Sequence, residues 1–312
     1  MSVPKRAVIN ANKLSRWNGA LQHTLAGAAV CSGIGVHSGE PTQVVVRPAP
    51  ADTGIVFVRT DITGRDNRVE ALASNVANTE LNTEIANEAG VAVSTIEHLM
   101  AALAALSIDN AVIEIDAREV PIMDGSAQPF IALLDRAGRR TQDAARRFIE
   151  ILRPVEVVVG DKRAALLPAA GFAVDFELVY DNPVIGRQRV ALEVDEASFR
   201  RELARARTFG FMHEVEYLQS KGLARGGSLD NAVVIEGETI LNPEGLRMER
   251  EFVRHKALDA VGDLYTLGAP ILGRFESVRG GHALNNALCR ELLAQPDAWC
   301  ERTWLDEFAE AV

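Results

Sequence analysis

Residues 249–267 predict a helix whose two faces differ in chemistry. One face carries apolar residues at helical spacing, namely Phe252, Val253, Leu258, Val261 and Leu264. On another face, side chains four positions apart lie above one another, so His255, Asp259 and Asp263 form a column. Two carboxylates stacked in this way destabilise a helix by roughly 0.2–0.5 kcal/mol. A chain that keeps both is therefore expected to hold a cation in front of them.

The pair His255 and Asp259 has the spacing of two metal ligands on one helix. A neutral imidazole nitrogen and a carboxylate oxygen one turn apart can bind the same zinc ion. Two ligands do not make a site, and the alternative is an ordinary His-Asp ion pair on a helix surface. A metal centre is predicted only if another part of the chain supplies a third ligand.

Charge and cysteine content narrow the classes of partner. The formal net charge of -10 argues against nucleic-acid binding, which needs a basic face. An anionic substrate must therefore be held by a few local cations.

The three cysteines, Cys31, Cys289 and Cys300, are odd in number and lack CxxC spacing. A reducing cytosol is therefore expected, without disulfides or a thiolate zinc site. No apolar run approaches the ~18 residues of a spanning helix, so no stable membrane insertion is expected.

The first half of the chain begins with strand-like segments. Residues 1–20 lack clear periodicity and are predicted to be a flexible N-terminal extension. The glycine-rich segment Cys31–Gly39 is interpreted as a turn rather than a phosphate loop, because neither GxGxxG nor GxxxxGK[ST] occurs in it. Thr42–Pro48 is typical of a strand, and Ile55–Arg59 is its predicted hairpin partner.

The segment from Ser94 to Glu97 predicts the start of a helix. It matches the S/T-x-x-E capping box, and a run rich in alanine and leucine follows it to Leu106. In the structural interpretation, Glu97 caps the helix and His98 is a packed helix histidine. In the functional interpretation, His98 is a metal ligand and Glu97 is a base that can reach the metal's water.

The second half of the chain repeats the order of the first. Strands are predicted at 149–159, 163–168 and 172–180, again ahead of helices, which indicates a duplicated α+β unit. A chain of 312 residues is expected to form two domains, and the arginine-rich segment Asp135–Arg147 places their boundary near residue 145. The predicted domains are residues 21–145 and 146–312.

Seven short motifs occur in order along the chain. They are Ser94-Thr-Ile-Glu-His-Leu99, Ile108-Asp-Asn110, Pro121-Ile-Met-Asp-Gly-Ser126, Ala206-Arg-Thr-Phe-Gly-Phe-Met212, Phe252-Val-Arg-His-Lys256, Asp259-Ala-Val-Gly-Asp263 and Gly281-His-Ala-Leu-Asn-Asn286. Together they resemble the UDP-3-O-acyl-N-acetylglucosamine deacetylase family, the zinc enzymes of lipid A synthesis, from about Leu21 to about Trp299. The resemblance implies two similar α+β domains, each a small mixed sheet with helices packed on one face. It places the active site in the cleft between them.

The resemblance also implies one zinc ion per chain. His98 from the first domain would join His255 and Asp259 from the second, which leaves a fourth position for water, as catalytic zinc requires. Glu97 would be the general base for that water.

Further roles follow from the resemblance for residues on the substrate side. His282, held by Asp263, is the implied cationic partner, which would stabilise the oxyanion and protonate the departing amine. Thr208 is expected to donate a hydrogen bond to the oxyanion, and Phe209 to contact the substrate beside it.

The implied substrate is a UDP-linked, acylated N-acetylglucosamine. Lys256 and Lys162 match family lysines that meet the diphosphate, which would explain how an acidic chain holds an anionic ligand. The same resemblance implies a cytoplasmic monomer. An inserted β-α-β segment at about 208–235 would form a passage for the acyl chain. Candidates to line it are Val215, Leu218, Leu223 and Val233.

Other hydrolase classes lack their motifs here. A nucleobase deaminase would need HxE and PCxxC, and an α/β-hydrolase would need GxSxG, but none of these occurs in the sequence. The alternative is a non-catalytic module of the same fold that binds a sugar nucleotide, because fold alone does not fix function. The presence of Glu97, His282 and three metal ligands favours a metal-dependent amidohydrolase.

Overall fold

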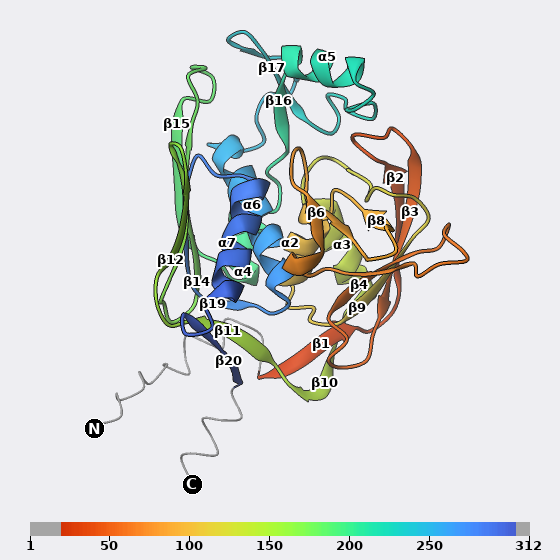
Figure 1. Cartoon of the computed structure of the whole chain (residues 1–312). Coiled ribbons are helices and arrows are strands. Elements are labelled where there is room, and N and C mark those ends of the chain that lie inside the picture. The colour runs from red at the N-terminus through yellow and green to blue at the C-terminus, as the bar shows by residue number, and fades with distance from the viewer. Residues whose placement is uncertain (1–19, 304–312) are drawn as a thin grey trace.

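Two mixed β-sheets flank a central group of helices in the computed structural model, which describes residues 20–303 (Figure 1). The central helices are α2 (Glu97–Ala105), α6 (Glu251–Leu264) and α7 (His282–Ala294). Buried apolar side chains of both sheets and of these helices form one continuous cluster. The predicted α+β fold class is confirmed. Apart from Ala20, the extension predicted for residues 1–20 lies outside the described residues.

The sheet of the first half has the strand order β2-β3-β9-β4-β5. Its strands are β2 (Ala29–Ile34), β3 (Pro41–Pro48), β9 (Ala111–Ile115), β4 (Ile55–Arg59) and β5 (Arg68–Glu70). The predicted hairpin between β3 and β4 is wrong, because β9 lies between them, antiparallel to β3 and parallel to β4. Parallel strands need a long connection, and α2 forms part of the connection from β4 to β9.

Smaller elements complete the first half. Helix α3 (Gln128–Ala137) packs against α2 and β2. A short 3₁₀ helix, η1 (Ala73–Asn75), precedes a second sheet, of β6 (Val76–Asn78), β7 (Glu84–Ala86) and β8 (Ala92–Val93). β1 (Leu21–Leu25) pairs with β10 (Arg139–Ala145) in an antiparallel ribbon. The boundary near residue 145, at the end of β10, stays a prediction.

The sheet of the second half is built around the long strand β19 (Ile271–Val278), which pairs with three others. Its other strands are β11 (Arg147–Ile151), β12 (Val155–Val159), β13 (Lys162–Leu167), β14 (Phe172–Val179), β15 (Arg187–Glu193) and β20 (Trp299–Thr303). The strand predicted at 149–159 is two strands, separated at 152–154, where Pro154 has no N–H to donate. Helix α6 packs against β14 and β15, and α7 against β12 and β13.

A separate layer of structure lies over one end of the central helices, at the top of Figure 1. It consists of β16 (Phe209–Phe211), α5 (Met212–Ser220), β17 (Val233–Glu236) and β18 (Thr239–Ile240), and we call residues 208–240 the arm. β16 runs parallel to β17, and β18 antiparallel to it. Helix α4 (Glu196–Glu202), whose Asp195 and Ser198 form a reciprocal cap, lies just before the arm in the chain.

Helices α2 and α6 approach each other closely at Gly262. A Cβ atom at this position would lie 2.0 Å from the carbonyl oxygen of Glu97, so only glycine fits. Helix α2 begins at Glu97 without a side-chain cap, and the predicted capping box is wrong because Ser94 Oγ donates instead to the Arg118 carbonyl. Helix α6 continues into the 3₁₀ turn η2 (Tyr265–Leu267). No helix in the described part of the chain is long and apolar enough to span a membrane.

Candidate metal centre and active site

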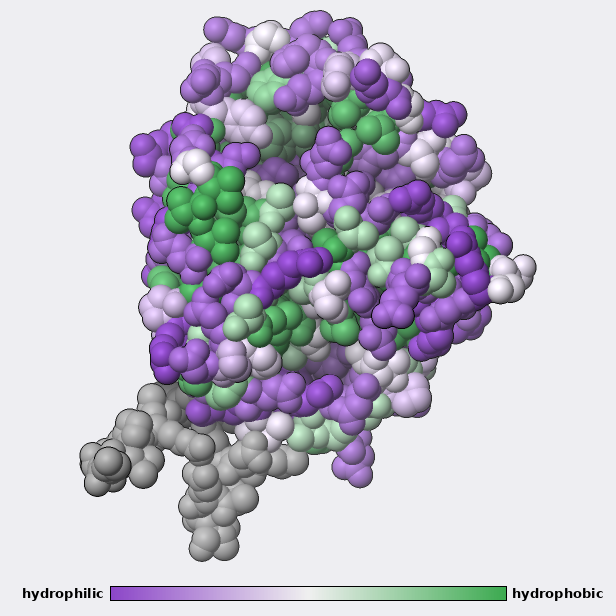
Figure 2. All heavy atoms as spheres, in the orientation of Figure 1, coloured by the Kyte–Doolittle hydropathy of each residue, from purple (hydrophilic) through white to green (hydrophobic). Residues whose placement is uncertain are grey.

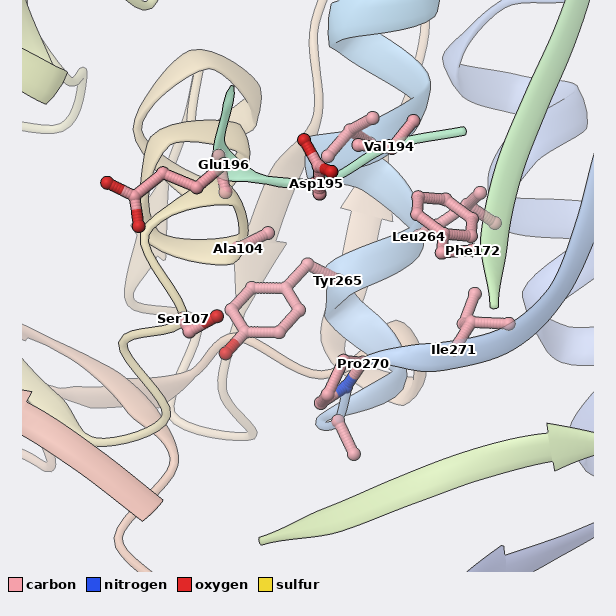
Figure 3. Close-up of a pocket in the computed structure, with 13 residues that line it drawn as sticks. Ala104, Ser107, Phe172, Val194, Asp195, Glu196, Leu264, Tyr265, Pro270 and Ile271 are labelled. Atoms are coloured by element: carbon pink, nitrogen blue, oxygen red, sulfur yellow. The ribbon is translucent and has the colours of Figure 1, made fainter. Parts of the chain in front are cut away.

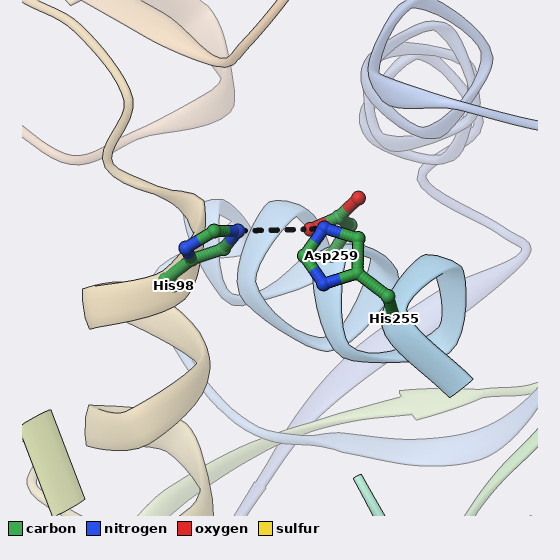
Figure 4. A group of neighbouring side chains, drawn as sticks. All are labelled: His98, His255 and Asp259. Carbon is green, nitrogen blue, oxygen red and sulfur yellow. Dashed lines mark ion pairs between the residues drawn. The ribbon is translucent and has the colours of Figure 1, made fainter. Parts of the chain in front are cut away.

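Three predicted metal ligands lie together at the junction of α2 and α6 (Figure 4). His98 projects from the first turn of α2, while His255 and Asp259 lie one turn apart on α6. The Nε2 atoms of His98 and His255 lie 3.5 Å and 3.3 Å from Asp259 Oδ1. One ligand atom from each residue fits within 4.8 Å of the others, and all three side chains are buried. The two predicted ligands on α6 are thus joined by a third, His98, from α2.

The hydrogen bonding of these residues fits a metal site. His255 Nδ1 lies 3.0 Å from the carbonyl oxygen of Ala206, which can only accept, so Nδ1 carries the proton and Nε2 presents a lone pair. Burial lowers the pKa of His255 to about 3, so its ring is neutral at pH 7. Within residues 20–303, Asp259 Oδ1 accepts no hydrogen bond, although it is buried. An unpartnered buried carboxylate oxygen between two imidazole nitrogens is the donor set that zinc takes.

Lys256 holds the other oxygen of Asp259. Its Nζ donates to Asp259 Oδ2 at 2.9 Å and lies 5.6 Å from the ring centroid of Phe209. Burial alone would lower the pKa of Lys256, but the charge of Asp259 outweighs it and raises the pKa. Burial would likewise raise the pKa of Asp259, but His255 and Lys256 hold it well below its ordinary value. The carboxylate is therefore ionised and available to a cation.

Glu97 lies beside this group at the start of α2. Its Oε2 accepts a hydrogen bond from the backbone N–H of Thr83 at 3.1 Å, and its Oε1 lies 4.0 Å from His282 Nε2. Burial raises the pKa of Glu97, and the charge of His282 offsets this only in part. The predicted base and the predicted cationic partner thus face each other across the centre.

His282 is held by a carboxylate that three donors surround. Its Nδ1 lies 2.9 Å from Asp263 Oδ2, which also accepts from Asn285 Nδ2 at 2.9 Å, while Thr83 Oγ1 donates to Asp263 Oδ1 at 2.6 Å. Burial alone would lower the pKa of His282, but Asp263 and then Glu97 outweigh it and raise the pKa to about 9. His282 is therefore a cation with its Nε2 directed toward the centre.

The segment that carries Ala206 and Thr208 is fixed from both sides. Arg207 and Glu251 form a fully buried ion pair, with Nε and Oε1 2.8 Å apart. The N–H of Arg207 also donates to Glu251 Oε1, and the N–H of Thr208 donates to the carbonyl of Gly125 at 2.8 Å. Glu251 lies one turn before His255 on α6, so this pair ties the carbonyl of Ala206 to the helix that bears His255.

A cavity of about 450 Å³ joins this centre to the arm. The surface is hollowed beneath the arm, with apolar side chains inside the hollow (Figure 2). The predicted site residues that line the cavity are Glu97, His98, Thr208, Phe209, His255, Lys256, Asp259 and His282. Asp263 lies behind His282. The structure thus brings nine of the ten predicted site residues to one end of one cavity.

The arm supplies the apolar part of this cavity. Its lining includes Met212, Val215, Leu218, Leu229 and Val234. Of the four predicted lining residues, Val215 and Leu218 are therefore present, whereas Leu223 and Val233 are not among the described lining residues. Successive side chains of a strand point to opposite faces, so Val234 faces the cavity and Val233 does not.

Lys162 is the predicted site residue that lies elsewhere. It is the exposed first residue of β13, opposite Val159 in the hairpin with β12, and is not among the described residues that line the cavity. Sequence reasoning also missed two residues that lie in the site. Asn285 belongs to the motif Gly281–Asn286. Thr83 comes from a polar stretch without periodicity, and nothing in the sequence singles it out.

A second pocket lies at the C-terminal ends of α2 and α6 (Figure 3). It is lined by apolar groups such as Phe172, Val194 and Leu264, and its volume is about 20 Å³. The hydroxyl of Tyr265 at its edge donates to the carbonyl of Ile108 at 2.8 Å. A space of this size holds little more than one water, so we interpret it as a packing gap.

Hydrolysis needs a base for water, an acid for the leaving group and a means of polarising the bond, and one end of the large cavity supplies side chains suited to each. Fold and site thus define the class as a hydrolytic enzyme with a group that can hold a metal. The sequence matches the model of the UDP-3-O-acyl N-acetylglycosamine deacetylase family over residues 22–294. The chain belongs to this family.

Individual relatives are similar over almost their whole lengths. The UDP-3-O-acyl-N-acetylglucosamine deacetylase of Phenylobacterium zucineum (strain HLK1) is 63% identical over 291 residues, which cover 93% of this chain and 99% of the relative. Proteins of the same name from Shewanella frigidimarina (strain NCIMB 400) and Vibrio vulnificus (strain YJ016) are 50% and 49% identical. Their matches cover 89% and 93% of this chain, and 91% and 96% of the relatives.

Proposed function

We propose that this chain hydrolyses the N-acetyl group of UDP-3-O-(3-hydroxyacyl)-N-acetylglucosamine, the committed step of lipid A biosynthesis. The products are acetate and the free 2-amine of the sugar. The observation that carries the proposal is the convergence of His98, His255 and Asp259 beside Glu97 and His282 at one end of a cavity. The names of the relatives supply the class of substrate.

The proposed cofactor is one zinc ion per chain, held by His98, His255 and Asp259. Two neutral imidazoles and a carboxylate are a common ligand set for catalytic zinc. When bound, zinc polarises the acetyl carbonyl and lowers the pKa of water toward neutrality. The N–H of His255 that donates to Ala206 fixes the ring so that Nε2 faces Asp259 Oδ1, where the ion would be held.

Proton transfers are assigned to the two groups that flank the ligands. Glu97 takes a proton from the attacking water, and the hydrogen bond from the Thr83 N–H keeps its carboxylate directed at the centre. His282 enters the reaction as a cation, stabilises the negative oxygen of the tetrahedral intermediate and donates its proton to the departing amine. Asp263 keeps His282 protonated and oriented.

Substrate contacts are assigned to residues along the cavity. Thr208 donates a hydrogen bond from its hydroxyl to the developing oxyanion, and Phe209 contacts the substrate beside it. Lys256 meets the diphosphate from the cavity, and Lys162 is assigned to the same group from the β12–β13 hairpin, outside the described lining. The apolar lining of the arm receives the acyl chain. A cytoplasmic location and a monomeric state stay predictions from the family resemblance.

The test is zinc content by elemental analysis together with acetate release from the proposed substrate. Wild-type protein is expected to hold one zinc per chain and to release acetate. His255→Ala is expected to lose both, and Glu97→Gln is expected to keep zinc and lose turnover. Zinc without acetate release from substrates of several acyl lengths would favour the non-catalytic module. Acetate release by zinc-free protein would remove the metal from the proposal.

A further inference from the structure

Thr83 lies between the two proton-transfer groups of the proposed reaction. It precedes β7, in the first half of the chain, and only 2% of it is exposed. Its backbone N–H donates to Glu97 Oε2 at 3.1 Å, and its hydroxyl donates to Asp263 Oδ1 at 2.6 Å. The same hydroxyl oxygen lies 3.4 Å from His282 Nδ1. One residue therefore contacts the base, the acid and the carboxylate that holds the acid.

The hydroxyl of Thr83 has a defined task within this group. Asp263 Oδ2 already receives two donors, His282 and Asn285, whereas Thr83 is the donor to Oδ1 in the described part of the chain. A carboxylate held at both oxygens cannot rotate. The ring of His282, which is attached to it, is then fixed in direction as well.

We propose that Thr83 is a positioning residue for the hydrolysis, acting through Asp263 on His282 and through its N–H on Glu97. The inference rests on the proposed function. It assigns Thr83 no contact with substrate or metal. Thr83 belongs to the first half of the chain, whereas Asp263 and His282 lie on α6 and α7 of the second half. Its hydroxyl contacts therefore also fix Glu97 of the first half relative to His282 of the second.

The test compares Thr83→Val with Thr83→Ser. Valine has nearly the same shape but no hydroxyl, and serine keeps the hydroxyl. Partners that orient catalytic groups typically contribute 10- to 100-fold, so we expect kcat of Thr83→Val to fall by roughly that factor, with KM and zinc content as in wild type. Thr83→Ser is expected to recover kcat to within a few-fold. If the valine variant does not fold, Thr83→Ala removes the same hydroxyl.

Thr24→Val is the matched control. Thr24 is also a fully buried threonine, whose hydroxyl donates to the Asn110 carbonyl at 2.7 Å and accepts from the N–H of Ala49 at 2.9 Å. Loss of the Thr24 hydroxyl should lower the free energy of unfolding and leave kcat unchanged. Wild-type kcat in Thr83→Val, or a loss of kcat that follows a loss of zinc, would overturn the inference. Wild-type protein that releases no acetate would overturn the proposed function and the inference with it.

Discussion

Helices α5 and α6 line the same cavity, but the protein around them holds them very differently. Twelve of the fourteen residues of α6 are buried, including the polar His255, Asp259 and Asp263. None of the nine described residues of α5 is buried. Helix α6 packs against α2, α7 and the strands β14 and β15, whereas α5 packs against β16 and β17 of the arm.

The difference matches what each end of the cavity is proposed to do. Bond-making groups must be held within a fraction of an ångström, so they belong on buried helices whose polar atoms have fixed partners. The attraction between an aliphatic chain and an apolar wall has no direction, so a loosely held helix is sufficient for it. Substitutions in α6 and its neighbours should therefore affect chemistry and stability, and substitutions in α5 should affect only the choice of substrate.

Asp259→Ala should have the largest effect. It removes the oxygen that both histidine nitrogens face, and the zinc ion proposed to bind there would contribute several kcal/mol of transition-state stabilisation. Loss of about 4 kcal/mol corresponds to a roughly 10³-fold fall in kcat. Elemental analysis and steady-state kinetics measure both quantities. Zinc content and kcat near wild type would show that Asp259 is a structural carboxylate.

Arg207→Met tests how far the buried polar contacts support the end of the cavity that carries His98, His255 and Asp259, which we call the proposed metal end. It leaves Glu251 buried without its cation, which is expected to lower the free energy of unfolding by about 3–5 kcal/mol. Zinc affinity should also fall, because the Ala206 carbonyl that orients His255 is then less well held. Chelator competition and urea unfolding measure these changes. The control is Arg187→Met, which removes an exposed partner of Glu177 and should cost at most about 1 kcal/mol.

Gly262→Ala tests the contact between α2 and α6, the two helices that carry the predicted ligands. The new Cβ would lie 2.0 Å from the Glu97 carbonyl oxygen, which is backbone and cannot move alone. We expect the free energy of unfolding to fall by about 1–3 kcal/mol, as for overpacked cores, and zinc affinity to fall with it. Gly210→Ala in the arm is the control, since its Cβ would meet its nearest neighbour, Val215, at an ordinary 3.8 Å. Equal stability of the two variants would contradict the contrast between the regions.

Residues of the proposed metal end could be predicted from the sequence where they lie on the same helix at helical spacing. His255, Asp259 and Asp263 follow from spacing on one helix, because four residues always make about one turn. The meeting of His98 with that column does not follow from spacing. It depends on how closely α2 approaches α6 at Gly262, which is a property of tertiary packing. The family resemblance, rather than any local pattern, supplied His98 as a predicted ligand.

Other parts were mispredicted or missed because distant contacts override local patterns. The capping box at Ser94 is absent because the hydroxyl finds a partner at Arg118, far along the chain. The position of β9 between β3 and β4 depends on sheet assembly, which turn and strand propensities do not encode. Thr83 carries no sequence signal, since its role consists of bonds to residues that are remote in sequence or in another element.

Leu218→Ala in α5 should have the smallest effect on the protein itself. Leu218 lines the cavity but is only partly buried, so the change in unfolding free energy should stay below about 1 kcal/mol. A removed apolar contact weakens binding of an aliphatic chain by roughly 1–3 kcal/mol at most, so KM for long-chain substrates should rise about tenfold while kcat stays constant. Tyr217→Ala, at a neighbouring residue that is 62% exposed and is not among the described lining residues, should change neither. A fall in kcat for Leu218→Ala with a short-chain substrate would mean that α5 also orders the catalytic end, and the division between the two regions would no longer hold.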